Sequence, residues 1–438
     1  MTVFWCERAI VDGRVEDAVR ISVVDGVIHS VDVRAAASGT DEILPGLILA
    51  GLANAHSHAF HRALRGRTHG DGGTFWTWRT AMYDVATRLS PDSYRRLATA
   101  VFAEMVLAGF TLVGEFHYIH GRPDGTPYGD AAMERAILAA AADAGIRLTL
   151  LDTLYLRGGL AEDGSALPLA TDQRRFSDGS VEAWGRRRAL VSSTATAIVG
   201  AAVHSVRAVA PADLREFRER TRGLPVHAHV SEQPAENAQV LAETGRTPMR
   251  VLADADLIDP SFTAVHATHV SAEDIDALAR PAAFACFCPT TERDLADGIG
   301  PARRLADAGV RLTLGSDQHV ALDPFEEARG IEMNERLASG QRGRFDPAEL
   351  LVMAGQDGYR SLGWTGGRLV VGSVCDLVAV DPGSPRTAGS RSDQVWLSAS
   401  ASDVTDVVVH GRRVVTARKH RLGDVGTLLA EAIAEVWA

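Results

Sequence analysis

Eight short apolar runs, separated by stretches rich in Ala, Leu and Arg, constrain the fold of this 438-residue chain more than any other feature. The runs have the length and β-branched content of buried strands, and the stretches between them have the composition of helices. This alternation is typical of βα units around a parallel sheet. The expected strands are residues 52–56, 111–117, 147–154, 198–204, 224–229, 262–266, 283–288 and 311–315. We therefore predict an α/β protein with a TIM-type (β/α)8 barrel.

The two ends of the chain have a different texture. Asp12-Gly13 and Asp25-Gly26 are hairpin-turn pairs between short β-like segments near the N-terminus. Alternating segments return at residues 368–381 and 406–415. The pattern predicts a small β-sandwich domain built from both ends. The expected division is residues 1–50 and 366–438 for this domain, and residues 51–365 for the barrel.

Composition limits the partners of the chain. Hydrophobic residues make up 46% and charged residues 23%, as in a globular protein with a large core. The net charge of −11 gives no general excess of positive charge for binding nucleic acid or anionic membranes. No apolar stretch has the length of a membrane span or signal peptide. The four cysteines Cys6, Cys286, Cys288 and Cys375 are too few for a disulfide framework. We expect a cytoplasmic protein that binds a small molecule.

Polar residues gather where the expected strands end. His56 and His58 point to the same face, so one ion can contact both. His229 ends the fifth strand, and Asp317 follows the eighth in a Gly-Ser-Asp turn. An HxH pair alone is equally compatible with two histidines at a barrel rim that form ordinary hydrogen bonds and bind no metal. All four residues together suit a first-row divalent metal with one position left for water.

Two further residues have the chemistry of proton carriers. Glu232 follows His229 by three residues, close enough to move a proton between water and a leaving nitrogen, although a carboxylate here also suits a helix start. His266 ends the sixth strand and is a second candidate, and Asp317 is expected to assist both as ligand and as catalytic carboxylate. His227, His269 and His319 also lie near strand ends, and no separate role follows from their positions.

Several segments together resemble the amidohydrolase superfamily over nearly the whole chain. The residues follow the order HxH, His, HxxE, His, Asp, and GRLVVGSVCDLVAVD resembles the C-terminal segment of the superfamily. NAHSHAFHRALRG, FWTWR, GEFHYIH, VHSVRAV and CPTTERDLADG are similar to the formimidoylglutamate deiminase branch, which acts in histidine degradation. The resemblance implies hydrolysis of N-formimino-L-glutamate to N-formyl-L-glutamate and ammonia, and it implies a homodimer.

The resemblance also bears on the metal. Many members of the superfamily hold two metals bridged by a carboxylated lysine on the fourth strand. The only lysine here is Lys419, in the C-terminal segment. We therefore expect one divalent metal per chain, Zn²⁺ in the first place with Fe²⁺ as an alternative, bound by His56, His58, His229 and Asp317.

The same resemblance assigns substrate contacts. N-formimino-L-glutamate carries two carboxylates, which guanidinium and phenol groups bind by charge-assisted hydrogen bonds. At position 61 this chain has His where related sequences have Gln, and Trp76 and Trp78 near Arg79 suit either loop packing or a pocket wall. The expected substrate-binding residues are His61, Arg79, Tyr118, His204 and Arg207.

Two other functions fit parts of the pattern. A deaminase of nucleobases or other amidines would use the same metal residues without the arginines that bind the acid groups. A catalytically silent protein of the same fold would bind a partner and take up no metal. Because the metal and proton-transfer positions are intact, we expect an enzyme with Glu232, His266 and Asp317 as catalytic residues.

Overall fold

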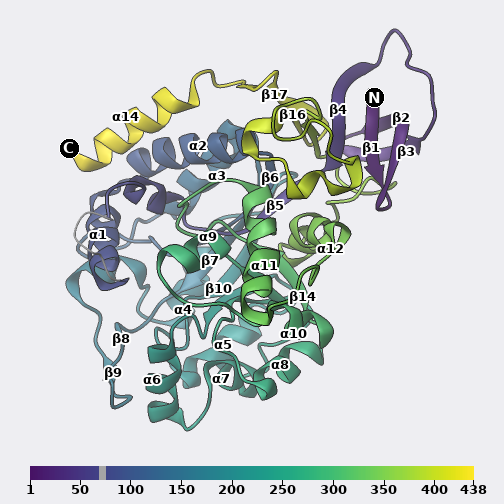
Figure 1. The fold of residues 1–438 in the computed structure, drawn as a ribbon. Coiled ribbons are helices and arrows are strands. Elements are labelled where there is room, and N and C mark those ends of the chain that lie inside the picture. The colour runs from purple at the N-terminus through teal and green to yellow at the C-terminus, as the bar shows by residue number, and fades with distance from the viewer. Residues whose placement is uncertain (69–74) are drawn as a thin grey trace.

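The computed structural model describes residues 1–68 and 75–438, and it contains a barrel of eight parallel strands (Figure 1). Neighbouring strands pair in sequence order, and a bridge between Ser57 and Asp317 joins the first strand to the segment after the last. Each predicted run overlaps one strand, which confirms the TIM-type barrel. The strands are β5 Leu52–Ser57, β6 Phe110–His117, β7 Arg147–Leu154, β10 Ala197–Val203, β11 Val226–Val230, β12 Phe262–His266, β13 Phe284–Phe287 and β14 Arg311–Leu314.

The two ends of the chain meet in a second sheet, as the sequence predicted. Its strand order is β18-β17-β16-β15-β4-β1-β2-β3. The sheet curls, because Val27 at its β3 edge forms a bridge with Val374 just before β15, and it encloses a core of its own around Phe4 and Ile21. Its strands are β1 Thr2–Val11, β2 Arg14–Val24, β3 Val27–Asp32, β4 Glu42–Ala50, β15 Leu377–Val380, β16 Val404–Val409, β17 Arg412–Thr416 and β18 Lys419–His420. Two short strands, β8 Gly159–Leu160 and β9 Ala166–Leu167, form a hairpin.

Helices cover the outside of the barrel (Figure 1). Many begin with proline, whose fixed φ and missing N–H suit the first helical turn. α2 shows the pattern in full, with Ser90 as N-cap, Pro91 in the first turn and Gly109 at φ 103° after the last turn. The α-helices are α1 Phe75–Arg88, α2 Pro91–Ala108, α3 Ala132–Ala144, α4 Val181–Arg188, α5 Pro211–Arg220, α6 Pro234–Thr244, α7 Pro248–Asp254, α8 Ala272–Ala279, α9 Pro289–Asp294, α10 Ala302–Asp307, α11 Pro324–Ser339, α12 Pro347–Val352, α13 Gly358–Ser361 and α14 Val425–Trp437.

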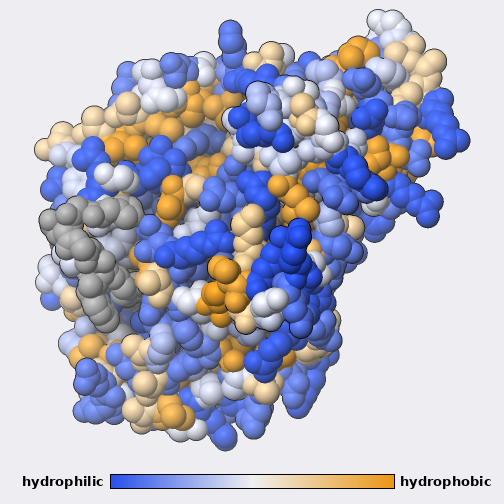
Figure 2. Space-filling view, viewed as in Figure 1, coloured by the Kyte–Doolittle hydropathy of each residue, from blue (hydrophilic) through white to orange (hydrophobic). Residues whose placement is uncertain are grey.

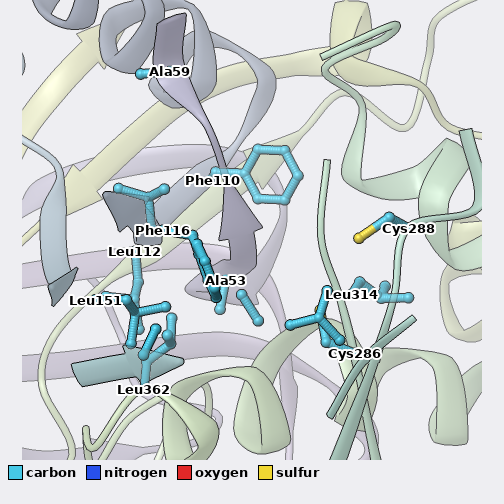
Figure 3. Packing of buried hydrophobic residues seen from close by; sticks show 14 of the residues in the cluster. Ala53, Ala59, Phe110, Leu112, Phe116, Leu151, Cys286, Cys288, Leu314 and Leu362 are labelled. Atoms are coloured by element: carbon cyan, nitrogen blue, oxygen red, sulfur yellow. The ribbon is translucent and has the colours of Figure 1, made fainter. Parts of the chain in front are cut away.

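The second sheet contacts the barrel at the amino-terminal end of its strands, and the active site is expected at the opposite end. Apolar side chains such as Phe110, Leu112 and Leu314 fill the interior (Figure 3). At the amino-terminal end of β7, buried Arg147 donates to Asp376 at 2.7 Å, which links the barrel to the second sheet. The polar side chains predicted at the carboxyl ends of the strands therefore face the open end, where TIM barrels place their active sites.

The exterior shows no large apolar face in the view of Figure 2, where hydrophilic residues interrupt the apolar ones. Among the described residues, no helix combines the length and apolar content needed to cross a membrane. All four cysteines are buried free thiols, as their small number and spacing indicated.

Candidate functional site

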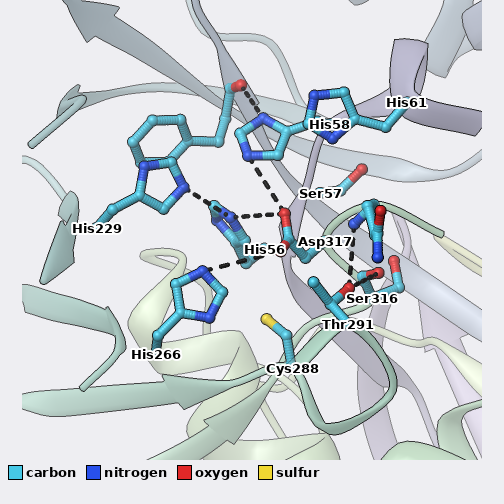
Figure 4. A network of polar contacts seen from close by, with 12 residues as sticks. His56, Ser57, His58, His61, His229, His266, Cys288, Thr291, Ser316 and Asp317 are labelled. Atoms are coloured by element: carbon cyan, nitrogen blue, oxygen red, sulfur yellow. Dashed lines mark hydrogen bonds and ion pairs between the residues drawn. The ribbon is translucent and has the colours of Figure 1, made fainter. Parts of the chain in front are cut away.

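Four side chains meet at the carboxyl end of the barrel (Figure 4). His56 lies in β5 and His58 directly after it, His229 lies in β11, and Asp317 follows β14. The Nε2 atoms of His56 and His229 are 3.1 Å apart. Oδ1 of Asp317 lies 3.4 Å from Nε2 of His56 and 3.4 Å from Nε2 of His58. The structure thus brings the four predicted metal ligands together, and all are buried.

The hydrogen bonds of these histidines indicate what the group can hold. Nδ1 of His58 donates to the carbonyl of Phe116, and Nδ1 of His229 donates to that of His204, both at 2.9 Å. Because a carbonyl only accepts, each Nδ1 carries the proton and each neutral ring turns an Nε2 lone pair inward. Burial lowers the pKa of His58 and His229 well below the ordinary value, which favours the neutral rings. Lone pairs and a carboxylate that converge in this way fit a divalent cation, and the donor set suits zinc.

The two predicted proton carriers border the same centre. Nε2 of His266 lies 3.8 Å from Oε1 of Glu232 and 3.8 Å from Oδ2 of Asp317. On its other side, Nδ1 of His266 lies 3.4 Å from Oε1 of Glu292. Burial alone would lower the pKa of His266, but the negative charges of Glu232, Glu292 and Asp317 outweigh it and raise that pKa well above the ordinary value. The three carboxylates thus favour the protonated form of His266 beside the candidate metal centre.

The backbone around the centre is strained. Ser231, His266, Ala267, Asp317 and His319 all have positive φ, between 44° and 68°, although none is glycine. Such conformations cost about 1–3 kcal/mol each and persist where the surrounding structure requires them. They lie at or within a few residues of the carboxyl ends of β11, β12 and β14, where the chain turns sharply to bring Glu232, His266 and Asp317 to one place.

A cavity of about 190 Å³ opens above the centre, and all five predicted substrate residues line it. Nε2 of His61 lies 3.1 Å from the hydroxyl of Tyr118. Burial, followed by the positive charges of Arg207 and Arg79, lowers the pKa of His204 well below its ordinary value, so both guanidinium groups lie near this ring. The residues are His61, Arg79, Tyr118, His204 and Arg207.

Arg207 is available to a ligand in this cavity. Its Nε is buried without a hydrogen-bond partner, and within residues 1–68 and 75–438 it forms no ion pair. Trp78 also lines the cavity, and the centre of its ring lies 5.1 Å from that of His61. For Trp78 this favours a place in the pocket wall over simple loop packing. Residues 69–74 in the long loop after β5 and the Trp76 side chain lie outside the described part of the chain.

The remaining strand-end histidines have ordinary partners. His227 bonds the carbonyl of Ser361 at 3.0 Å, and His269 bonds that of Asp297 at 2.7 Å. His319 lies 2.9 Å from the hydroxyl of Ser316. Glu292, beside His266, was not singled out from the sequence. Tyr83, Tyr155 and Gln173, which also border the cavity region, were missed as well.

A second buried cluster lies under α4. Oε1 of Glu134 lies 3.2 Å from Nε2 of His117 and 2.7 Å from Nδ1 of His120. Arg187 contacts the same oxygen at 2.8 Å and also contacts Asp152 at 2.8 Å. Because a guanidinium already supplies the positive charge at Glu134, the cluster is a closed ion-pair network that ties α4 to β7.

We expect Arg187→Leu to destabilise the fold by about 3–5 kcal/mol, because it leaves buried carboxylates without their counter-charge. The measurement is the shift of the chemical unfolding transition. Arg186→Leu is the matched control, since Arg186 is exposed and its one ion pair within the described residues, with Glu182 a helical turn away, is worth less than about 1 kcal/mol. Equal shifts for both variants would contradict this account of the network.

Comparison with known proteins places the chain. Residues 43–414 match the amidohydrolase family. Formimidoylglutamate deiminase of Pseudomonas aeruginosa is 37% identical over 96% of both chains, and a 5-methylthioadenosine/S-adenosylhomocysteine deaminase of Natronomonas pharaonis is 28% identical over 93% of this chain and 90% of its own. Among solved structures, an amidohydrolase from Brucella melitensis has a TM-score of 0.91 and 32% identity over 100% of both chains. A zinc-bound adenosine deaminase from Xanthomonas campestris has a TM-score of 0.82 at 22% identity, covering 99% of this chain and 97% of its own, and shows the shared fold.

Proposed function

This chain belongs to the amidohydrolase family, and we propose that it hydrolyses N-formimino-L-glutamate to N-formyl-L-glutamate and ammonia. The observation that carries the proposal is the distribution of charge in the cavity. Asp317 and Glu232 lie at the floor beside the metal ligands, and Arg79 and Arg207 lie around His204 on the wall. The substrate has a matching polarity, with a cationic formamidine at one end and two carboxylates at the other.

The proposed ligands of the metal are His56, His58, His229 and Asp317. A divalent metal at this place would lower the pKa of a water to about 7 and so supply a nucleophile at neutral pH. The carbonyls of Phe116 and His204 keep the rings of His58 and His229 oriented for it. Asp317 also lies 3.8 Å from Nε2 of His266, so its negative charge acts on that ring.

The chain's own residues carry the proton and orient the substrate. Glu232 Oε1 accepts a proton from the attacking water and delivers it to the formimino nitrogen, which leaves as ammonia. As the C–N bond breaks, the carbon keeps the oxygen, and the Glu232 carboxylate takes the second water proton so that the formyl C=O forms. With a cationic formamidine, this proton ends on the ammonia as ammonium. His266, held between Glu232 and Glu292, stabilises the charge that develops on the oxygen. Arg79 and Arg207 bind the two carboxylates, and Tyr118, His61 and His204 complete the wall.

The direct test is ammonia release by metal-quantified protein. N-formimino-L-glutamate is compared with guanine and 5′-methylthioadenosine, which represent the nucleobase and nucleoside deaminases. We expect turnover of the first compound with about one metal per chain. Turnover of a purine compound alone would contradict the proposed substrate. Metal-loaded protein that releases ammonia from none of the three compounds would contradict the proposed hydrolase activity.

Arg207→Ala should chiefly weaken substrate binding. Loss of a guanidinium from a desolvated carboxylate costs about 2–5 kcal/mol, so KM should rise about 30-fold or more while kcat changes less. Steady-state kinetics give both values. Arg215→Ala on α5, outside the cavity, is the control. An unchanged KM for Arg207→Ala would remove Arg207 from the carboxylate site.

A further inference from the structure

Gln173 organises the outer wall of the cavity. It lies in the 3-10 helix η2 Thr171–Phe176, where its Oε1 accepts from the backbone N–H of Ala170 at 2.9 Å. This bond fixes the amide, so the NH2 group faces the other way. There, Nε2 lies 3.1 Å from the hydroxyl of Tyr83, 2.9 Å from that of Tyr155 and 3.1 Å from the carbonyl of Gly158. Both tyrosines line the cavity.

Arg79 directs a further donor at one of these hydroxyls. Its Nε donates to the hydroxyl of Tyr83 at 2.8 Å. The NH2 group of Gln173 has two hydrogens, of which one goes to the Gly158 carbonyl and the other to the nearer hydroxyl, that of Tyr155. The hydroxyl of Tyr83 accepts from Nε of Arg79, so both hydroxyls act as acceptors and retain their own hydrogens. A hydrogen bond between the two hydroxyls would use only one of these hydrogens, because only one member of such a pair donates. No carbonyl or carboxylate among the described residues accepts the other hydrogen.

The position of the pair relative to the metal ligands suits the far end of a short substrate. The ring of His229 lies 5.1 Å from that of His204, and the ring of His204 lies 4.7 Å from that of Tyr155. Tyr155 is therefore two ring contacts from the candidate metal centre, on the side where the arginines lie. Within the proposed substrate, the carbon chain of glutamate separates the formimino carbon from the side-chain carboxylate in the same way, whereas the α-carboxylate lies closer to it.

We propose that Tyr83 and Tyr155, oriented by Gln173, donate to a carboxylate of the substrate that Arg79 binds. This inference rests on the proposed function and extends it to two residues that determine specificity for an acid group. A hydroxyl with a hydrogen left to donate in this cavity forms a strong hydrogen bond with an anionic oxygen. A ligand without an acid group at this place offers no such acceptor, so the hydroxyls favour a ligand that has one.

The test uses the Tyr83→Phe/Tyr155→Phe double variant and both single variants, with Tyr128→Phe as control because Tyr128 lies outside the cavity against Arg122. Substrates are N-formimino-L-glutamate, N-formimino-4-aminobutyrate, which lacks the α-carboxylate, and N-formimino-L-norvaline, which lacks the side-chain carboxylate. We expect KM for the dicarboxylate to rise about 10- to 100-fold in the double variant, from the usual strength of a hydrogen bond to a charged group, with kcat little changed. The defect should vanish with one of the two monocarboxylates.

An equal defect with both monocarboxylates, or no defect with any substrate, would overturn the inference. A crystal structure with N-formyl-L-glutamate gives an independent readout. A carboxylate oxygen within hydrogen-bond distance of a tyrosine hydroxyl is expected, and a carboxylate bound by arginine alone would contradict it. Failure of the proposed function is distinguishable, because the unaltered protein would then neither turn over nor bind these compounds.

Discussion

Replacing Glu232 by Gln is expected to lower kcat for N-formimino-L-glutamate by about 10²-fold or more while the metal content stays unchanged. The amide keeps the size of the side chain but cannot accept and release the proton that moves from water to the leaving nitrogen, and general acid-base catalysis is worth about 10²–10⁴-fold. Glu232 is not among the four converging ligands, so the metal should remain. The measurement pairs steady-state kinetics with elemental analysis of the purified variant.

Glu216→Gln is the matched control for this variant. Glu216 lies on the surface of α5 and pairs with Arg220, away from the cavity, so its replacement should leave kcat near that of the unaltered protein. Near-normal turnover of Glu232→Gln would remove Glu232 from proton transfer. A variant that loses its metal would instead make Glu232 a ligand, contrary to the proposed ligand set of His56, His58, His229 and Asp317.

Replacing Asp317 by Asn is expected to abolish most of the activity, with a fall of about 10³-fold or more. Asp317 supplies the only carboxylate that lies within 3.4 Å of His56 and His58 among the described residues, so the change removes the negative charge that favours a divalent cation. A catalytic metal stabilises the transition state by several kcal/mol, and each 1.36 kcal/mol is tenfold in rate. Kinetics and metal content are measured on the same sample.

Asp276→Asn, on the exposed face of α8, controls for the substitution itself. Chelation of the unaltered protein should reproduce the loss, and added zinc should reverse it in that protein only. An Asp317→Asn variant that retains full metal content and turnover would show that the charge at this position is dispensable.

The barrel could be predicted because each strand is a short, separate apolar run with helical sequence on both sides. The hairpin turns at Asp12-Gly13 and Asp25-Gly26 were also readable, and the structure gives all four residues positive φ. The order of the second sheet was not readable. It depends on the parallel pairing of Phe4 with Glu42 and on the antiparallel pairing of Leu377 with Ala50, contacts between distant parts of the chain that leave no local pattern.

The residues of the candidate site also fall into those that the sequence predicts and those that it does not. The proposed metal ligands lie at or just after the carboxyl ends of barrel strands, so the topology alone places them at one end. Tyr155 directly follows β7, and the same rule would have found it. Gln173 lies in a short 3-10 helix and Tyr83 in α1, and neither segment has a periodicity that points to the cavity. Their roles depend on how loops fold over the barrel, which only the three-dimensional arrangement reveals.

The most direct test of the central claim is identification of the products from substrate labelled with ¹³C at the formimino carbon. Hydrolysis can break either of the two C–N bonds at this carbon. The account predicts that the label appears by NMR in the formyl group of N-formyl-L-glutamate, with one ammonia released per molecule. Label in formamide, with free L-glutamate as the second product, would contradict the proposed delivery of the proton by Glu232, and unconsumed substrate would contradict the proposed function itself.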